Sequence, residues 1–342
     1  MAPGGSFCAI NAAGQRQAKP PGGWRARLCK GRNGDLGEIG RAVDILLFGA
    51  NGQVGWELRR SLSALGNLTA LDRAQADLEQ PVQDLIERAR PDVIVNAAAY
   101  TSVDRAEAEA DRALRINGQA VGEMAQAASR VQALLVHYST DYVFDGEKSA
   151  PYAEDDPPAP INAYGRSKLA GEQAIRAVAG CRHLILRTSW VYASRGKNFA
   201  RTILERARSM ERLQVVADTW GVPTSAELLA DVTALAVYRA RLARAGTPGA
   251  GAELQGTFHL VPCGQTTWHE YACLLIESAR SRGLPVRVSR ENIVPVAASS
   301  VAAPARRPKN SRLDNRRLQQ YLGVELPDWQ VHVRRFVDEI AG

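Results

Sequence analysis

The stretch DILLFGANGQVGWELRRSLSALG, residues 44–66, contains the pattern that decides the fold. Its continuous apolar run, Ile45–Phe48, is typical of a strand buried on both faces. Three glycines follow, and apolar side chains then recur at helical spacing: Val54, Leu58, Leu62 and Leu65. The stretch therefore predicts a strand, a glycine-rich turn and a helix.

The chain repeats this alternation as far as about residue 190. Four further apolar segments predict strands at 67–72, 92–100, 133–144 and 183–192. Between them, the patterns predict helices at 81–91, at 104–130 as one long helix, and from 162 onward. Strands that alternate with helices indicate an α/β fold with a doubly wound parallel sheet and right-handed crossovers.

Beyond about residue 190 the alternation is less regular. We expect a helix near 196–211, a strand at 213–218, a loop at 219–225 and a helix that begins after Ser225 as N-cap. A strand at 257–261, a helix capped by Thr266 or Thr267, and two short helices complete the chain. We therefore divide the sequence into an NAD(P)-binding domain, residues 44–190, and a mainly substrate-binding region, residues 191–342.

Residues 1–43 predict a disordered extension, or an upstream translation start, since they are rich in Gly, Arg and Pro and lack periodicity. They hold seven basic and two acidic residues, and so account for most of the formal net charge of +7. The nearly neutral remainder argues against a nucleic-acid-binding surface.

Composition also argues against several other classes of protein. No apolar run is long enough to span a membrane. Five scattered cysteines without a C-x-x-C pair predict reduced thiols in the cytoplasm. The pair His269-Glu270 begins like a zinc-binding H-E-x-x-H motif, but Cys273 stands where the second histidine belongs.

The glycine-rich turn predicts a dinucleotide site. Glycines let the backbone approach a pyrophosphate, and the N-terminus of the helix supplies N–H groups to it. Asp72, which ends the second predicted strand, is suited to bind the adenosine ribose of NADH, while Arg73 beside it leaves NADPH open. The predicted cofactor-binding residues are Gly49, Gly52, Gln53, Val54, Gly55, Asp72, Arg73, Asp77, Leu78, Ala98, Ala99, Tyr100, Thr101, Tyr138, Ser139, Tyr164 and Lys168.

The segment NAYGRSKLAGEQA, residues 162–174, places Tyr164 and Lys168 one helical turn apart. Thr140 ends the preceding strand, so all three side chains are expected to meet near the nicotinamide. We expect the Lys168 cation to lower the pKa of the Tyr164 phenol, which then donates a proton, while Thr140 holds the substrate oxygen.

A set of segments resembles one enzyme family. FGANGQVGWEL, DVIVNAAAYTSVDRAE, YSTDYVFDG, YGRSKLAGE, RTSWVY, TWGVPTSAELLAD, ARRPKNSRL and LPDWQ occur in order between about residues 44 and 340. Together they are similar to the dTDP-4-dehydrorhamnose reductases, extended short-chain dehydrogenases/reductases. The resemblance implies a cytoplasmic oxidoreductase of dTDP-rhamnose and O-antigen biosynthesis, which reduces the C4 ketone of dTDP-6-deoxy-L-lyxo-4-hexulose.

The resemblance also implies roles for residues outside the dinucleotide motif. Thr140, Asp141 and Trp190 would contact the sugar nucleotide, and Arg306 and Arg307 would hold its diphosphate. A homodimer and a Mg²⁺ ion between its subunits are also implied, with ligands that match Glu57, Glu227 and Glu339.

The residues leave alternatives open. Tyr142 follows Thr140-Asp141 where related dehydratases carry an acid, so elimination of water is disfavoured. An epimerase or another nucleotide-sugar reductase would use the same Tyr164, Lys168 and cofactor. A non-catalytic regulatory subunit that binds a dinucleotide is the alternative from a different functional class.

Overall fold

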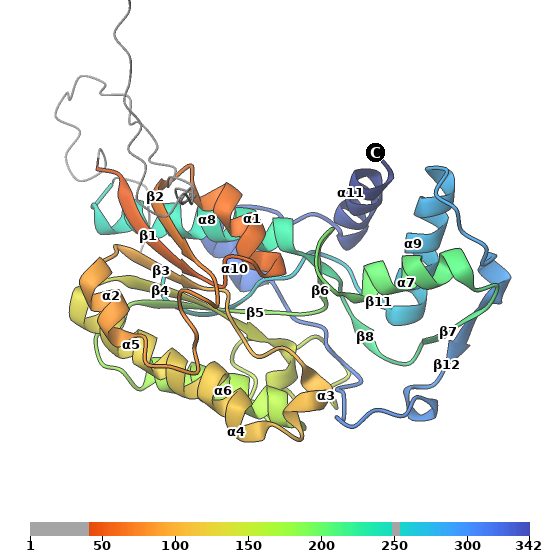
Figure 1. Cartoon of the computed structure of the whole chain (residues 1–342), viewed down its shortest axis with the longest axis horizontal. Coiled ribbons are helices and arrows are strands. Elements are labelled where there is room, and N and C mark those ends of the chain that lie inside the picture. Colours follow the sequence, from red (N-terminus) through yellow and green to blue (C-terminus); the bar gives the residue numbers. More distant parts are fainter. Residues whose placement is uncertain (1–40, 248–253) are drawn as a thin grey trace, which may run out of the picture. The chain divides into compact units, whose positions relative to one another are not determined.

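The computed structural model describes residues 41–247 and 254–342. A sheet of six parallel strands, in the order β10-β5-β4-β3-β1-β2, has helices on both faces (Figure 1). The predicted fold class is therefore confirmed. Residues 1–40 of the expected extension lie outside the described residues. Val43, the last residue of that expected extension, belongs to β1 instead.

The first half of the sheet follows the predicted alternation closely. It consists of β1 (Val43–Phe48), α1 (Gln53–Leu62), β2 (Gly66–Leu71), α2 (Gln83–Ala89) and β3 (Val93–Asn96). β1 pairs with β2 on one side and with β3 on the other. The strand order thus changes direction beside the carboxyl end of β1, which is where sheets of this type bind ligands.

The prediction of one long helix over 104–130 is wrong. The structure divides this stretch into α3 (Val103–Ala106), α4 (Ala110–Leu114), a π-helical turn (Arg115–Gln119) and α5 (Ala120–Val131). Asn117 in the π-helical turn accepts a hydrogen bond from the Tyr100 backbone N–H, and its amide donates to the Ser167 hydroxyl. These tertiary contacts favour the π-helical turn, which lies within continuous helix from Ala110 to Val131 and which helical periodicity does not reveal; the chain leaves the helix only between Ala106 and Ala110.

The second half of the sheet supplies the remaining strands. It contains β4 (Leu134–Thr140), a 3₁₀ turn (Asp141–Val143), α6 (Ala163–Arg176), β5 (His183–Thr188) and, much later in the chain, β10 (Gly256–His259). Because β10 pairs with β5, the region after residue 190 contributes to the sheet as well as to a smaller region of its own.

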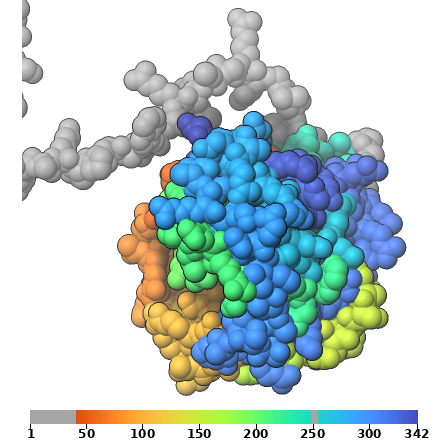
Figure 2. Space-filling model, turned by 90° about the vertical axis from the view of Figure 1, so that its right-hand side faces the viewer, coloured from red at the N-terminus to blue at the C-terminus, as the bar shows by residue number. Residues whose placement is uncertain are grey.

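That smaller region lies at the carboxyl ends of the strands, and its green-to-blue residues make up most of the face shown in Figure 2. Its main helices are α7 (Phe199–Ser209), α9 (Trp268–Ser281) and α11 (Trp329–Ala341), while α10 (Arg316–Leu322) packs near β10. Short strands join them: β6 (Val191–Tyr192), β7 (Leu213–Val216), β8 (Trp220–Gly221), β9 (Thr224–Ser225), β11 (Thr266–Thr267) and β12 (Ile293–Val296). The predicted loop at 219–225 therefore contains two short strands.

Two predicted helix starts are confirmed. The Ser225 hydroxyl accepts the Leu228 N–H at the start of α8 (Ala226–Arg244). Thr267 rather than Thr266 caps α9, in a capping box with Glu270. Both caps satisfy backbone N–H groups that a helix N-terminus leaves without partners.

Side chains of β1 alternate between two apolar cores, as expected for a strand covered on both faces. Ile45 and Leu47 pack into a core with residues of α1 and α8, while Leu46 and Phe48 pack into one with residues of α2 and α5. This double burial holds the carboxyl end of β1, and with it the glycine-rich turn, in a fixed place. Among the described residues no helix combines the length and apolar character needed to cross a membrane.

Candidate active site

A cavity of about 710 Å³ lies at the carboxyl ends of β1 to β5. It gathers nearly all of the predicted cofactor-binding and catalytic residues, which come from five separate segments of the chain. The predicted residues that line it are Gly49, Gly52, Gln53, Val54, Asp72, Arg73, Asp77, Leu78, Ala98, Ala99, Thr101, Tyr138, Ser139, Thr140, Asp141, Tyr164, Lys168 and Trp190.

The glycine-rich turn forms one wall of the cavity. Gly49 has a φ of +82°, and a Cβ there would lie 2.6 Å from the Ala98 backbone nitrogen. Gly52 precedes α1 as its N-cap without a side-chain cap, and the first turn of the helix contains no acidic residue, so this helix N-terminus is suited to an anion. Gly55, also predicted to bind the cofactor, does not line the cavity. A Cβ there would lie 2.0 Å from the Gly49 carbonyl oxygen, so a glycine is needed for α1 to pack closely on the turn.

Asp72 and Arg73 lie at the end of β2. The Asp72 carboxylate accepts hydrogen bonds from the Asn51 amide at 3.0 Å and from the Ala74 N–H at 3.0 Å, which orients it at the cavity wall. Arg73 is ion-paired with Asp77 and Glu79. Any ligand phosphate at Arg73 must therefore compete with two carboxylates.

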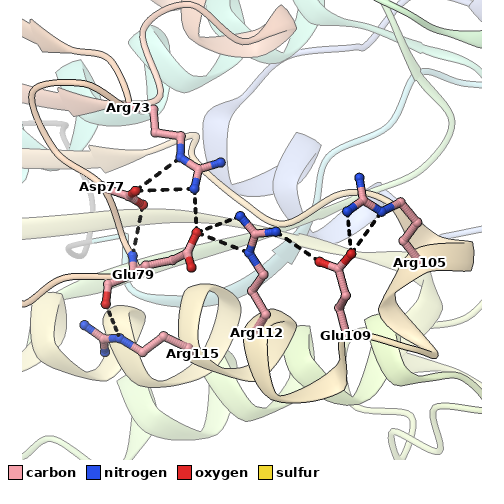
Figure 3. A network of polar contacts seen from close by, with 7 residues as sticks. All are labelled: Arg73, Asp77, Glu79, Arg105, Glu109, Arg112 and Arg115. Atoms are coloured by element: carbon pink, nitrogen blue, oxygen red, sulfur yellow. Dashed lines mark hydrogen bonds and ion pairs between the residues drawn. The ribbon is translucent and has the colours of Figure 1, made fainter.

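Those ion pairs belong to a larger network at the edge of the cavity (Figure 3). Glu79 also pairs with Arg112 at 2.8 Å, and Arg112 pairs in turn with Glu109 at 3.1 Å. The network links the end of β2 to α4. It therefore connects the residues expected at the adenosine ribose to a helix that the sequence analysis did not associate with the cofactor.

Tyr164 and Lys168 enter the cavity from the first two turns of α6. Asn162 caps this helix by accepting the Gly165 N–H at 2.7 Å. A Cβ at Gly165 would lie 2.1 Å from the Tyr142 oxygen, so a glycine is required for α6 to approach the turn after β4. This packing brings the Tyr164 phenol to Thr140 and Asp141 at the end of β4.

The expected lowering of the Tyr164 pKa by Lys168 is wrong for this structure. Burial, together with the nearby Asp141 carboxylate, raises the pKa of Tyr164 to about 12, while a hydrogen bond with Thr140 opposes the shift. The Lys168 ammonium group instead lies against β4, 2.6 Å from the Tyr138 carbonyl oxygen and 3.2 Å from His137 Nε2. Burial lowers the pKa of Lys168 to about 8. Tyr164 is accordingly protonated at neutral pH, as a proton donor must be.

Two hydroxyl groups lie beside the phenol, and each already has an acceptor. Ser139 donates to Glu172 at 2.6 Å, and Thr140 donates to Asp141 at 3.0 Å. Burial raises the pKa of Asp141 to about 7, against hydrogen bonds that lower it. Because Ser139 and Thr140 donate to carboxylates, Tyr164 is the hydroxyl best able to give its proton to a ligand in the cavity.

Trp190 lines the cavity in a strained backbone conformation, with a φ of +47°. Its ring stacks on Trp268 with centroids 3.6 Å apart. Arg306 and Arg307, predicted to bind diphosphate, are not among the lining residues, and Arg307 is ion-paired with Asp104 at 2.8 Å. Their role stays a prediction that would require the segment around them to move.

The predicted metal ligands gather without forming a metal site in this chain. Glu57, Glu227 and Glu339 line one small surface pocket. Glu227 pairs with Arg335 at 3.0 Å, Glu57 lies 3.5 Å from Arg60, and Glu339 accepts a hydrogen bond from a serine. Over residues 41–247 and 254–342, no three carboxylate, imidazole or thiol groups are arranged to hold a metal. The Mg²⁺ site between subunits stays a prediction.

Sequence reasoning missed several lining residues. Thr188 ends β5 and Ser189 follows it. The reasoning that placed Ser139 and Thr140 at the end of their strand could therefore have found them. Arg195 and Lys197 come from a loop near the glycine-rich turn, where Asn198 donates to the Gln53 side chain at 2.8 Å. No local signal indicated them, because the loop reaches the turn only through the tertiary fold.

A family model and curated relatives match almost the whole described chain. Residues 43–341 match the family described as RmlD substrate binding domain. The dTDP-4-dehydrorhamnose reductase of Burkholderia thailandensis is 51% identical over 85% of this chain and 97% of its own length. The enzyme of the same name from Escherichia coli K12 is 47% identical over 87% of this chain and 98% of its own. The chain belongs to the dTDP-4-dehydrorhamnose reductase family.

Solved structures agree with this assignment. The dTDP-4-dehydrorhamnose reductase of Bacillus anthracis, crystallised with NADP, superposes with a TM-score of 0.77 at 32% identity and covers 87% of this chain and 100% of its own. A UDP-glucose 4-epimerase from Thermus thermophilus, with NAD, has a TM-score of 0.71 at 20% identity over 87% of this chain and 99% of its own. The second likeness concerns the fold alone.

Proposed function

We propose that this protein reduces the C4 ketone of dTDP-6-deoxy-L-lyxo-4-hexulose to the alcohol of dTDP-L-rhamnose. One observation carries the proposal: a single cavity joins the glycine-rich turn to Tyr164, Lys168 and Thr140. Curated relatives that are 46–51% identical over most of their length are named for this reaction. The combination favours a reductase that acts on a nucleotide sugar.

The residues fit a nicotinamide dinucleotide. Gly49 lets the turn pass close to the Ala98 backbone at the cavity wall, and no side chain caps or carries negative charge into the first turn of α1, where a pyrophosphate would lie. When bound, the reduced nicotinamide supplies the hydride that C4 receives. We propose that either NADH or NADPH can bind. Asp72 suits the ribose hydroxyl groups of NADH. Arg73 can bind the 2′-phosphate of NADPH, but only in competition with its acidic partners.

Tyr164 is the proposed proton donor to the sugar O4. Its phenol is protonated at neutral pH and lies at the end of β4, where Thr140 and Asp141 orient the sugar. Trp190 packs against the sugar nucleotide. A well-placed proton donor of this kind contributes roughly 10²–10⁴ in rate.

Tyr142 distinguishes reduction from dehydration. It follows Asp141 in the 3₁₀ turn, and its ring meets Tyr164 edge-on with centroids 5.8 Å apart. Burial raises the pKa of its phenol far above the neutral range. It cannot act as the carboxylic acid that removal of water requires, so the site favours simple ketone reduction.

We also propose that the protein acts in the cytoplasm as a homodimer. The three cysteines that lie in the described part of the chain are free thiols. The pocket formed by Glu57, Glu227 and Glu339 is a candidate contact between subunits.

The test is an assay with purified protein, the keto-sugar and each reduced cofactor, followed by nicotinamide absorbance. Tyr164→Phe is expected to lose about 10²–10⁴ in kcat while it retains cofactor binding. Tyr238→Phe, at an exposed position, is the matched control and should retain full activity. Absence of cofactor oxidation by the wild-type protein would favour the regulatory-subunit alternative.

A further inference from the structure

The loop between β6 and α7, residues 193–198, contributes two basic side chains to the cavity that the proposed reaction does not yet use. They are Arg195, which is half-buried, and Lys197, which is exposed, with Gly196 between them. We call this segment the basic loop.

The basic loop is held against the start of α1. The Asn198 amide donates to the Ala193 carbonyl and to the side-chain oxygen of Gln53, both at 2.8 Å. Gln53 is the first residue of α1. Gly196 has a φ of +73°, and a Cβ there would lie 3.2 Å from Gln53 Cγ, so the loop passes close to the helix start. The loop backbone is therefore fixed beside the first turn of α1.

The Arg195 side chain is held at the same place by an aromatic ring. Its guanidinium carbon lies over the ring of Trp56, 3.6 Å from the centroid, and Trp56 is the fourth residue of α1. A cation over the face of an indole is attracted by the negative charge of that face. Trp56 thus keeps the guanidinium of Arg195 near the N-terminal end of α1.

These two cations differ from the other basic side chains of the cavity. Arg73 is ion-paired with two carboxylates, and the Lys168 amine lies against a backbone carbonyl of β4. Arg195 and Lys197 have no carboxylate partner within the described part of the chain. They are therefore available to an anion that enters the cavity.

We propose that Arg195 and Lys197 complete the pyrophosphate site of the dinucleotide, and that Trp56 is the positioning residue for Arg195. The proposal rests on the proposed function for the presence of a dinucleotide. A guanidinium can donate to two phosphate oxygens at once, and an ammonium group adds a second positive charge. The two cations match the two negative charges of a pyrophosphate, which the uncapped start of α1 also attracts.

The diphosphate of a sugar nucleotide offers the same chemistry to the basic loop. The contacts that fix the loop favour the dinucleotide, because both Asn198 and Arg195 are held by side chains of the first four residues of α1. This is the helix that follows the glycine-rich turn.

The first experiment measures binding by calorimetry, without the keto-sugar, for NADH, NADPH and thymidine diphosphate. Arg195→Ala should weaken the binding of both cofactors about tenfold, the effect of one hydrogen bond to a charged group, and leave their ratio unchanged. Lys197→Ala, at an exposed position, should weaken both about threefold. Arg208→Ala removes an exposed cation of α7 outside the cavity and should change neither affinity.

Each other outcome has a definite meaning. Unchanged cofactor affinities in both loop variants would overturn the proposal. A loss confined to thymidine diphosphate would assign the basic loop to the substrate, and a loss confined to NADPH would assign it to the 2′-phosphate; either result overturns the pyrophosphate assignment. A wild-type protein that binds both cofactors but does not oxidise them with the keto-sugar would contradict the proposed function alone.

The second experiment tests the role of Trp56. Trp56→Leu should weaken cofactor binding about two- to threefold in the wild-type background, the effect of one exposed cation–π contact, and have no further effect in Arg195→Ala. Trp56→Phe keeps a ring beneath the guanidinium and should retain most of the affinity. Arg195→Gln replaces Arg195→Ala if the latter does not fold. Equal losses from Trp56→Leu in both backgrounds would contradict the positioning role.

Discussion

Trp190 and Trp268 stack with their ring centroids 3.6 Å apart, although one follows β5 and the other begins α9. Gly221 in β8 borders the same pair, since a Cβ there would lie 2.5 Å from two carbons of the Trp190 ring. The two contacts hold Trp190 at the cavity in spite of its strained backbone. The position of this indole in the cavity thus depends on three separate segments.

Gly221→Ala is therefore expected to displace Trp190. Gly221 has no positive φ, so the added methyl group acts by its contact with the ring and not by backbone strain. KM for the sugar nucleotide should rise about tenfold, corresponding to about 1.4 kcal/mol, with little change in cofactor affinity. Steady-state kinetics provide the measurement, and Trp220→Phe, at the neighbouring exposed position, is the control. An unchanged KM would mean that Trp190 does not contact the substrate.

Asp141 predicts a dependence of stability on pH. Its pKa is raised from 3.8 to about 7 in the folded state, so folding favours the protonated acid. The stabilisation this gives is complete below about pH 4 and is lost as the pH rises through 7. A shift of about three units corresponds to about 4 kcal/mol. The lowered pKa of Lys168 costs stability at neutral pH, and this cost is relieved only as the pH rises from about 8 towards 10.5.

Urea unfolding of wild type and Asp141→Asn at pH 5 and pH 8 measures this effect. The variant should gain stability relative to wild type at the higher pH. Asp145→Asn provides the control, because the Tyr152 hydroxyl lowers the pKa of Asp145 from 3.8, so this carboxyl is charged in both the folded and the unfolded state at pH 5 and at pH 8. The stability difference between this variant and wild type should therefore be the same at the two pH values. A constant difference between Asp141→Asn and wild type would show that Asp141 is ionised in the folded protein throughout this range.

Glu172→Gln should destabilise the protein strongly. Its carboxylate accepts two hydrogen bonds from Arg187, at 2.8 and 2.6 Å, and both side chains are almost fully buried. Loss of the carboxylate leaves Arg187 buried and unpaired, which costs about 3–5 kcal/mol. Glu205→Gln breaks a more exposed pair with Arg201 and should change the unfolding free energy by at most about 1 kcal/mol. Equal effects in the two variants would rule out the assigned role of the buried pair.

Glu79→Gln should shift cofactor preference toward NADPH. The substitution removes one of the two carboxylates that pair with Arg73 and leaves the guanidinium freer to bind a 2′-phosphate. We expect the ratio of NADPH to NADH affinity to rise about two- to fivefold, the effect of one exposed ion pair. Fluorescence titration with both cofactors measures the ratio. Glu87→Gln, which breaks a comparable pair with Arg130, should leave it unchanged.

Local patterns along the chain suffice to predict the parallel sheet, the glycine-rich turn and the grouping of Thr140, Tyr164 and Lys168 around one cavity. These features depend on local patterns: strand burial, helical spacing and the rule that parallel strands end at one edge of the sheet. The starts of α8 and α9 followed from Ser225 and Thr267 in the same way, because a cap acts within one helical turn.

The electrostatics of the site and the partners of its side chains arise only when distant segments pack together. Tyr164 and Lys168 share a helical face, yet burial and Asp141 raise the pKa of one while His137 and the Tyr138 carbonyl contact the other. Such effects depend on desolvation and on neighbours from distant segments, which spacing along one helix does not contain. The break of the 104–130 helix and the stack of Trp190 on Trp268 have the same origin, since each arises where separate segments pack together.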